Sequence, residues 1–443
     1  MLKRTSRRRF MQVTATTGIG FWVTGGLTAA ESQSPNEKIA MASIGVDGKG
    51  QSDSNDANAH GVMVAICDVD DKRLAAAAQR FPKAKKFNDF RKMLDEMGKS
   101  IDAVTVSTPD HVHAAASVMA MKMGKHCFCQ KPLTHTIYEA RIMGEVAREK
   151  KVATQMGNQF TAFGRLRKLA AMLRGGILGQ VSAVHVWTNR PIWDQGIARP
   201  KEEPVPSFLH WDLWLGPAPL RPYGRGYHPF AWRGWWDFGT GALGDMACHT
   251  VNMPYMGLEL KDPTTVEAET SGHNKDSYPS WSVIKFQFPG NAWRGPLSMT
   301  WYDGGQRPPL DLLKGVLKEK QKISGSGCLV IGEKGKLYAP GDYAEREYTF
   351  TGVEEPKEVK YEESPGHFQE WIRAIKGGPP ARSNFPDYAG PLVEVILLGN
   401  LSVWTADKGK GKKIEWDAKE LKATNAPEVA EVIKAPYRAG YSL

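Results

Sequence analysis

Short apolar runs alternate with alanine-rich or amphipathic stretches between residues 38 and 156. An apolar run of about four to eight residues bounded by turn residues is typical of a strand buried on both faces. Because strands that alternate with helices of about 10–15 residues form βαβ units, this region predicts a parallel sheet covered by helices. The expected strands are residues 39–44, 62–67, 101–106, 126–129 and 152–156, and the expected helices are residues 71–80, 112–123 and 138–150, with a strand end and a helix within residues 87–97.

The pattern changes after about residue 158. Residues 181–187 and 281–288 alternate apolar and polar side chains, which is typical of antiparallel strands with one face in the core. Residues 391–406 are strongly apolar and predict a helix packed on a sheet. We therefore expect an α/β protein. Its expected parts are a doubly wound parallel sheet over residues 36–157 and a second α/β domain over residues 158–443, with a large open, mainly antiparallel sheet and a loop-rich insertion at residues 189–244.

The first thirty residues differ from the rest in charge. Lys3, Arg4 and three consecutive arginines at positions 7–9 precede an uncharged, moderately apolar stretch that ends in small residues. This is the layout of an export signal, and its paired arginines indicate the twin-arginine type, which is an address read by a receptor. We expect residues 1–30 to be this signal, so that the twin-arginine machinery exports the protein to the periplasm or cell envelope. Retention of the segment as a membrane anchor stays open.

Charge and cysteine content narrow the classes of partner and site. The formal net charge is +10, of which five positive charges lie in the first nine residues. No stripe of lysine and arginine with interleaved aromatic residues is present, which argues against a nucleic-acid partner. The five cysteines are odd in number and irregularly spaced, which disfavours a disulfide framework or a zinc site. We expect no bound metal and cysteines that pack as small apolar residues.

A glycine-rich turn follows the first expected strand. Gly45 and Gly50 fit the first and third positions of G-x-G-x-x-G, whereas Asp47 occupies the second and Gly48 is additional. In that motif the backbone approaches a dinucleotide pyrophosphate, and an acid about 20 residues further on binds a ribose. Asp68 ends the next strand and fits this position. We expect a Rossmann domain that binds NAD(P), although a glycine turn without a ligand is the structural alternative. The expected cofactor contacts in this part are Gly45, Gly48, Gly50, Asp68 and Arg73.

The export signal also bears on the cofactor. The twin-arginine route carries folded proteins, so a cofactor would be loaded before export, and this favours a tightly bound NAD over an exchangeable one. Asp68 favours NAD, whereas Arg73, five residues later, leaves NADP possible.

Two further groups of residues follow expected strands, at the edge where open parallel sheets bind ligands. One leads into a helix whose first turn holds His113, and the other contains Lys131. A lysine can take part in proton transfer when burial lowers its pKa. A packing histidine and a solvated lysine are the structural alternatives. These groups add Ser107, Thr108, Pro109, His113, Gln130 and Lys131 to the expected cofactor contacts.

The most specific cluster lies between residues 235 and 252. Asp245 and His249 are four residues apart on an expected helix, so they share one face. An acid and an imidazole suit hydride transfer from a carbinol, because the hydroxyl must lose a proton as the hydride leaves. The alternative is a charge near a helix start and a packing histidine.

These motifs together resemble the Gfo/Idh/MocA oxidoreductase family over nearly the whole chain from about residue 38. The resemblance matches Lys131 to the lysine of the family's Glu-Lys-Pro motif, and Asp245 and His249 to its Asp-x-x-x-His motif. Thr108, Pro109 and His113 match its Thr-Pro-x-x-x-His motif. Three positions depart from the family pattern, namely Gln130 in place of glutamate, Asp47 in the glycine turn, and Asn252 where many members have an acid.

The resemblance also implies roles. His249 is the expected general base, and Asp245 positions the substrate or the lysine. Lys131 is expected to orient and polarise the substrate oxygen and to be able to share the proton. The family fold places an open sheet as the wall of the substrate site and often assembles through it, so we expect a homo-oligomer, either a dimer or a tetramer.

Half of the tryptophans fall in or beside the insertion. Seven of the fourteen lie between Trp187 and Trp236, together with several hydrogen-bonding side chains. Aromatic faces beside polar groups suit a sugar ring, whereas aromatic packing under a long loop is the alternative. The expected substrate contacts are Asn189, Arg190, Trp193, Arg233, Trp236, Asp245 and His249.

The function expected from these features is an NAD(P)-dependent oxidoreductase acting on a hydroxyl of a sugar, polyol or glycoside. Scarce cofactor outside the cytoplasm favours regeneration in place, by exchange between two sugars or within one catalytic cycle. The alternatives are an NAD-dependent glycoside hydrolase that oxidises the ring transiently and a catalytically silent carbohydrate-binding relative.

Overall fold

The computed structural model of the protein describes residues 38–317, 321–407 and 409–443. The expected signal, residues 1–30, lies outside these ranges. Within them, no helix has the length and apolar character needed to cross a bilayer. The described cysteines, at positions 67, 127, 129, 248 and 328, are buried and free.

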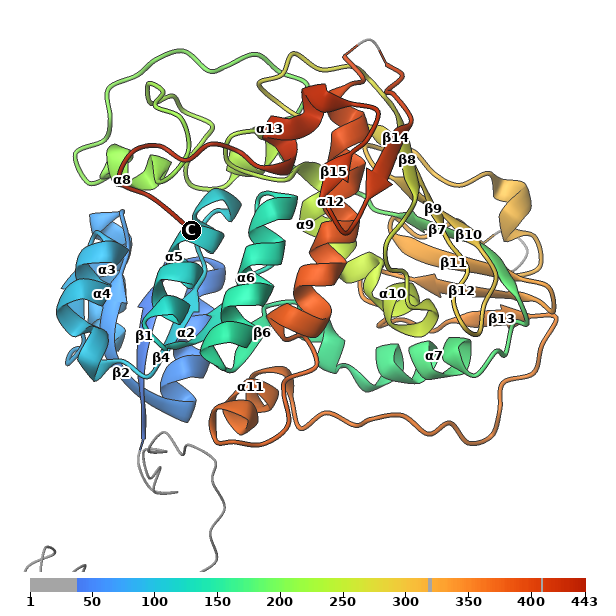
Figure 1. Ribbon diagram of the computed structural model, residues 1–443, viewed down its shortest axis with the longest axis horizontal. Coiled ribbons are helices and arrows are strands. Elements are labelled where there is room, and N and C mark those ends of the chain that lie inside the picture. The colour runs from blue at the N-terminus through green and yellow to red at the C-terminus, as the bar shows by residue number, and fades with distance from the viewer. Residues whose placement is uncertain (1–37, 318–320, 408) are drawn as a thin grey trace, which may run out of the picture. The chain divides into compact units, whose positions relative to one another are not determined.

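Residues 39–156 form the expected doubly wound parallel sheet (Figure 1). Its six strands follow the order β3-β2-β1-β4-β5-β6. The order in which successive strands are added to the sheet reverses between β1 and β4, and ligands bind at the carboxyl ends of strands beside such a switch point. The strands are β1 (Ile39–Ile44), β2 (Gly61–Cys67), β3 (Lys85–Phe87), β4 (Ala103–Val106), β5 (His126–Cys129) and β6 (Thr154–Met156), and the helices are α2 (Lys49–His60), α3 (Asp71–Arg80), α4 (Phe90–Met97), α5 (Asp110–Lys122) and α6 (Ile137–Lys150).

Alternate residues of these strands enter two separate cores. Met41 of β1 packs with residues of α3 on one face, whereas its neighbour Ala42 packs with residues of α5 and α6 on the other. Helix α11 (His367–Ile375) also covers the first face, and the indole of Trp371 donates to the Ala153 carbonyl at 3.1 Å. A helix from the C-terminal part of the chain therefore completes a layer of the parallel sheet.

The second sheet has nine strands in the order β13-β12-β11-β7-β10-β9-β8-β14-β15. Among the described strands, β7 and β10 pair in parallel and the other neighbours pair antiparallel, so the expected mainly antiparallel sheet is confirmed. The strands are β7 (Val181–Trp187), β8 (Thr265–Thr270), β9 (Ser282–Phe288), β10 (Leu297–Tyr302), β11 (Gly327–Gly332), β12 (Lys336–Pro340), β13 (Thr349–Thr351), β14 (Ile414–Asp417) and β15 (Lys422–Ala423).

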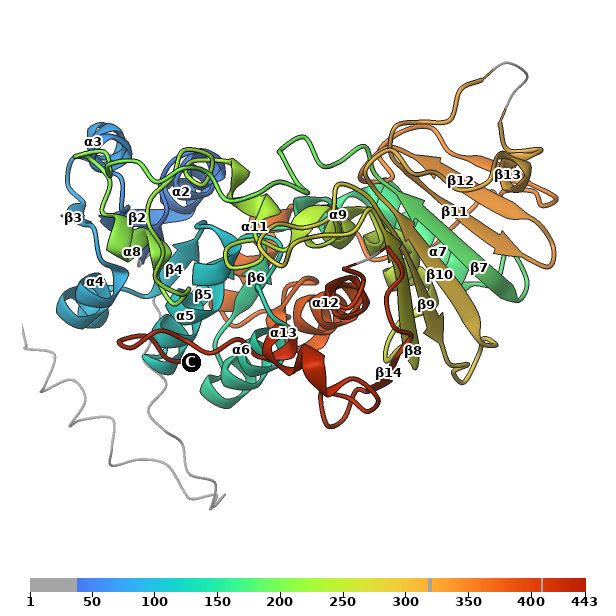
Figure 2. The same cartoon turned by 90° about the horizontal axis from the view of Figure 1, so that it is seen from above.

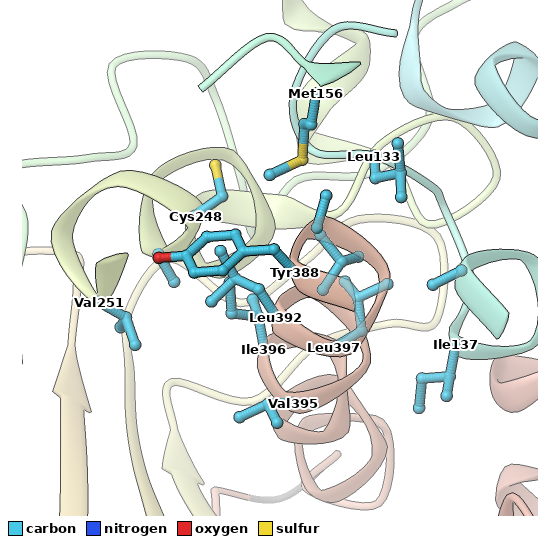
Figure 3. Close-up of a cluster of buried hydrophobic side chains, with 14 of the residues drawn as sticks. Leu133, Ile137, Met156, Cys248, Val251, Tyr388, Leu392, Val395, Ile396 and Leu397 are labelled. Carbon is cyan, nitrogen blue, oxygen red and sulfur yellow. The ribbon is translucent and has the colours of Figure 1, made fainter. Parts of the chain in front are cut away.

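Helix α12 (Gly390–Trp404) lies between the two sheets, as Figures 1 and 2 show, and it contacts α6, α9 and β8. In Figure 3, Leu392 and Ile396 of α12 lie between Ile137 of α6 on one side and, on the other, Cys248 of α9 and Val251, which directly follows α9. The strongly apolar sequence of α12 follows from this position, because neighbours bury the helix on nearly every side. The other helices of this part are α7 (Gly164–Arg174), α8 (Trp211–Leu215), α9 (Gly241–Thr250), α10 (Asn252–Leu258) and α13 (Ala430–Ile433).

The insertion over residues 189–244 folds back onto the parallel sheet. Leu209 forms an antiparallel bridge with Asp70, at the end of β2. The segment carries an aromatic core of its own, in which Trp211 and Trp214 stack with ring centroids 4.6 Å apart. Most tryptophans here therefore pack in a core, which is the structural alternative that the sequence left open.

Candidate active site

A cavity of about 410 Å³ lies at the carboxyl edge of the parallel sheet. Its volume is in the range of small-molecule and cofactor sites. The glycine turn and the ends of β2, β4 and β5 line one side, and residues of the insertion line the other. The expected cofactor contacts that line it are Gly45, Gly48, Asp68, Arg73, Ser107, Thr108, Pro109, Gln130 and Lys131.

The three glycines of the turn differ in how closely other backbone atoms approach them. Gly45 has a φ of 79°, and an added Cβ would lie 2.4 Å from the Ser107 carbonyl oxygen, so the backbone passes close to β4. Gly50 lies outside the cavity lining, and its added Cβ would meet the Gly45 carbonyl oxygen at 2.2 Å. Gly48 precedes the start of α2, and an added Cβ there would meet nothing within 4 Å. The N-terminus of α2 therefore opens toward the cavity, as anion-binding helix starts do.

Asp47 stands where the motif has a glycine, and its carboxylate pairs with Arg73 at 3.4 Å. Arg73 also pairs with Asp70 at 3.5 Å. Asp68 accepts the Val46 N–H at 3.1 Å and the Asp70 N–H at 3.0 Å, and burial raises the pKa of Asp68 to about 6. Each Asp68 oxygen keeps capacity for a further donor, since a carboxylate oxygen accepts more than one hydrogen bond.

A clasp covers the outer side of the cavity. We use this name for residues 206–216 and 228–233 of the insertion together with the C-terminal residues 436–441. The Asp71 N–H donates to the Phe208 carbonyl at 2.9 Å, and the His210 N–H donates to the Val69 carbonyl at 2.9 Å. His228 lies 3.1 Å from the Asp70 carboxylate.

The C-terminal part of the clasp is tied to the insertion. Arg438 donates from its Nε to the Gly216 carbonyl at 2.9 Å, and Tyr441 lines the cavity. The Arg91 guanidinium lies 4.3 Å from the centre of the Tyr441 ring. The clasp therefore brings the C-terminal segment of the chain against the insertion over one cavity.

Lys131 and Asp245 form the charged centre of the site. The Lys131 ammonium donates to Asp245 Oδ1 at 3.0 Å and to the Asp245 carbonyl at 2.9 Å, and Arg233 donates to the same Oδ1 at 3.2 Å. Burial disfavours the Asp245 charge, but the two cations outweigh it and lower the Asp245 pKa to about 2. Burial likewise opposes the Lys131 charge, yet Asp245 leaves the Lys131 pKa raised. Lys131 is therefore a fixed cation, suited to polarising an oxygen rather than to accepting a proton.

His249 lies one helical turn beyond Asp245 on α9 and is buried. Its Nδ1 has no hydrogen-bond partner among the described residues, and such an atom usually has one. Burial first, and then the Lys131 charge, lower its pKa well below the ordinary value. The imidazole is consequently neutral near pH 7, although the same burial and charge make it a weaker base than an ordinary histidine. His249 is not part of the cavity lining.

Asp110 is a buried acid near this centre that the sequence analysis did not identify. It lies in the first turn of α5 and accepts the Thr240 hydroxyl at 2.8 Å. Burial raises its pKa to about 7, against the opposing charge of Arg233. Its position directly after Pro109 was the available signal.

His113, an expected cofactor contact, lies fully buried behind the cavity. Its Nδ1 is 2.8 Å from the Pro132 carbonyl oxygen, and its Nε2 is 2.8 Å from the Thr108 carbonyl oxygen. His113 therefore connects the loop after β4 to the loop that carries Lys131.

The expected substrate contacts separate into three groups. Arg233 lines the cavity beside Lys131, and the Trp193 ring lies 5.8 Å from its guanidinium. Arg190, next to Asn189, lies 4.0 Å from Asp342 and contributes to the low pKa of His249. Trp236 instead stacks on Tyr278 with ring centroids 3.8 Å apart, outside the cavity lining.

An aromatic pair beside His249 was missed from the sequence. The edge of the His249 ring meets Tyr343 with centroids 4.8 Å apart, and Tyr343 stacks on Phe160 at 4.0 Å. These residues come from distant loops and carry no shared motif. Asn252, where the family often has an acid, is buried in the core and donates to Thr161 at 2.8 Å.

The residues present fit a nicotinamide dinucleotide. Gly48 and the start of α2 leave room and N–H groups for a pyrophosphate, and Asp68 offers acceptors for ribose hydroxyls. The opposite end of the cavity reaches Lys131 and Arg233. A dinucleotide in this orientation would present its reactive ring to the charged centre.

Comparisons with known proteins agree with this arrangement. A family model described as an oxidoreductase family with an NAD-binding Rossmann fold matches residues 39–158. A second, described as the C-terminal alpha/beta domain of an oxidoreductase family, matches residues 164–292.

Individual relatives are distant. Levoglucosan dehydrogenase from Pseudarthrobacter phenanthrenivorans is 26% identical over 192 residues, which is 43% of this chain and 41% of that protein. D-glucoside 3-dehydrogenase from Escherichia coli is 29% identical over 137 residues, which is 30% of this chain and 37% of that protein. The matched stretch therefore spans less than half of either relative.

A solved structure extends the likeness of the fold. The WlbA dehydrogenase from Bordetella pertussis, in complex with NADH and UDP-GlcNAcA, superposes with a TM-score of 0.59 at 17% identity. The match covers 86% of this chain and 99% of that chain. The shared architecture thus extends over nearly all of the solved dehydrogenase.

Proposed function

Because this chain belongs to the Gfo/Idh/MocA oxidoreductase family, we propose that it transfers a hydride between a bound nicotinamide dinucleotide and a hydroxyl-bearing carbon of a sugar, polyol or glycoside. The observation that carries the proposal is the charged centre. Lys131 and Arg233 both donate to Asp245 at one end of a cavity that fits the dinucleotide. The names of the relatives support a carbohydrate as substrate.

The residues divide the proton chemistry between them. Bound NAD would supply the hydride acceptor. The Lys131 ammonium, held by Asp245, donates a hydrogen bond to the substrate oxygen and stabilises the negative charge that develops there. Neutral His249 accepts the hydroxyl proton. Asp245, one turn away on the same helix, then stabilises the imidazolium.

NAD is the proposed cofactor in preference to NADP. Asp68 is mainly ionised at neutral pH, and a carboxylate beside the ribose would repel a 2′-phosphate. Arg73, the residue that leaves NADP possible, is occupied by Asp47 and Asp70. Replacement of Asp68 by alanine tests this assignment.

We also propose that the cofactor stays bound between turnovers. The clasp supports this, because it lies against the cavity and is held there by backbone hydrogen bonds to residues 69 and 71 and by the His228–Asp70 contact. A retained cofactor favours a closed cycle, in which a second substrate or a later step returns the hydride. Transient oxidation of a glycoside followed by elimination, hydration and reduction is therefore the second candidate function.

Two experiments test these proposals. Denaturation of the purified protein, followed by mass spectrometry of the released nucleotide, should give stoichiometric NAD. Addition of a panel of sugars, polyols and glycosides should then reduce the bound NAD, seen as near-ultraviolet absorbance of reduced nicotinamide. A keto sugar or lactone as product supports the oxidoreductase, whereas a simple released sugar supports the hydrolytic cycle. Protein that neither contains nor binds NAD would contradict both.

Localisation and assembly rest on the sequence alone. We propose export through residues 1–30, which a reporter fusion with Arg7 and Arg8 both replaced by lysine would test. We propose a homo-oligomer, which light scattering of the purified protein would test.

A further inference from the structure

A buried carboxylate in α2 connects the strand ends that form the cavity floor. The Asp53 side chain is only 2% exposed. Its Oδ2 accepts from Gln130 Nε2 at 2.8 Å and from the Ser107 hydroxyl at 2.8 Å. Its Oδ1 accepts from Lys49 Nζ at 2.7 Å. Asp53 therefore joins the first residue of α2, the end of β4 and the end of β5.

Gln130 passes this connection to the catalytic lysine. While its Nε2 donates to Asp53, its Oε1 accepts the backbone N–H of Lys131 at 3.1 Å. Gly157 backs the amide so closely that an added Cβ would lie 2.4 Å from Nε2. The side chain therefore has no room to turn away, and both of its polar ends are committed.

Only an amide serves both contacts. A carboxylate at position 130 could accept the Lys131 N–H, but it would face the Asp53 carboxylate at hydrogen-bond distance. Two carboxylates so close cannot both remain ionised without cost. The glutamine that departs from the family motif is thus the residue that Asp53 requires.

We propose that Asp53 is a positioning residue for Lys131, and that Asp53 and Gln130 are an exchanged acid–amide pair. In this chain the acid of the pair lies on α2, and the strand end, where the family motif has a glutamate, carries the amide. The pair sets the backbone of Lys131 and, through Lys49, the start of the helix that faces the pyrophosphate end. This inference rests on the proposed function in assigning catalysis to Lys131.

A charge swap tests the pair. Four proteins are compared, namely the native chain, Asp53→Asn, Gln130→Glu and the double variant. In the double variant, the amide introduced at position 53 donates to the carboxylate introduced at position 130, the oxygen of that amide still accepts from Lys49, and the Ser107 hydroxyl reverses its role. Asp56→Asn is the matched control, because it makes the same chemical change on an exposed side of α2.

Comparison of kcat with the KM for the sugar separates a positioning role from a general loss of structure. Misplacement of a reacting group by about 1 Å can cost about a hundredfold in rate. We therefore expect Gln130→Glu to lower kcat at least about tenfold, with a smaller change in the KM for the sugar, and Asp53→Asn to lower it less. The double variant should recover most of kcat, and Asp56→Asn should match the native chain.

A thermal readout does not depend on activity. In Gln130→Glu, the introduced carboxyl faces Asp53, so one of the two carboxyls has a raised pKa in the folded state. Folding then takes up a proton, and this variant gains stability relative to the native chain as the pH falls toward that of acetate buffers. The deficit in its unfolding temperature should therefore shrink at acidic pH, and the double variant should show no such trend. If no protein turns over any sugar, the proposed function fails while this readout still tests the pair.

The possible results are decisive. Recovery of kcat, or recovery of folding if Gln130→Glu does not fold, supports the exchanged pair. A double variant no better than Gln130→Glu, or a Gln130→Glu protein with native kcat and a native pH profile of unfolding, would overturn it.

Discussion

The two ends of the cavity use charge in opposite ways. At the glycine-turn end, Arg73 pairs with Asp47 and Asp70, and Asp68 holds two backbone N–H groups. At the other end, one Asp245 oxygen serves both Lys131 and Arg233. The first end holds its charges in mutual pairs and offers backbone and ribose contacts. The second has two cations for one carboxylate, so a positive charge is available for a substrate oxygen. The first end therefore suits cofactor binding, and the second suits chemistry.

The largest effect should come from Lys131. Lys131→Ala removes the cation that we propose stabilises the developing oxyanion, so we expect kcat to fall about a thousandfold or more. Bound nucleotide should remain stoichiometric by mass spectrometry, because binding belongs mainly to the other end. Lys92→Ala, on an exposed part of α4, is the control. Loss of nucleotide from Lys131→Ala would show that Lys131 also holds the cofactor, so that the two ends do not divide binding from chemistry.

His249 should have the next largest effect. His249→Asn removes the proposed proton acceptor, and we expect kcat to fall about a hundredfold. His60→Asn is the control. In the native protein the base must be neutral, and its pKa lies well below the ordinary value. Native kcat should therefore hold as the pH falls through about 6.5 and decline only in more acidic buffer. A decline centred at the ordinary imidazole pKa would remove His249 from this role.

A tenfold effect is expected from Asp68. Asp68→Ala takes away the carboxylate that we propose favours NAD, so the ratio of the dissociation constants for NADP and NAD should drop by about tenfold. Titration of nucleotide-stripped protein with each dinucleotide measures the ratio, while kcat with saturating NAD should change little. An unchanged ratio would place the selectivity elsewhere.

The smallest effect should come from the clasp. His228→Ala removes one contact to Asp70, worth about 1 kcal/mol. We expect the release of bound nucleotide to speed up about fivefold, as followed by exchange with labelled NAD. The steady-state rate should stay near native. Release as slow as in the native protein would show that the backbone contacts alone hold the clasp.

The strands and motifs were accessible from the sequence because their signals are local. The apolar runs of β1, β2 and β7 and the long apolar helix α12 were predicted close to their observed bounds. Lys131 and Asp245 were singled out by strand-end and helical spacing, and the structure brings them to 3.0 Å.

Features that depend on distant partners were not accessible. Helix α2 is polar throughout and buries only Gly50, Asp53, Ser54 and Ala57, so no apolar stripe marks it. The role of Asp53 depends on its contacts with Ser107 and Gln130, which lie 54 and 77 positions later in the chain. The tryptophans of the insertion suggested a sugar platform, but a long segment without regular structure needs an aromatic core of its own, and several of them supply it.

The burial of α12 between α6 and α9 has a mechanical consequence. In many two-domain enzymes, one domain rotates about a hinge and brings catalytic groups onto the substrate. Here such a swing would pull Leu392 and Ile396 out of the packing that Figure 3 shows. The spacing between Lys131 beside the parallel sheet and His249 on α9 is therefore established when the chain folds. Rearrangement of the loops at the cavity mouth would admit the substrate without breaking this packing.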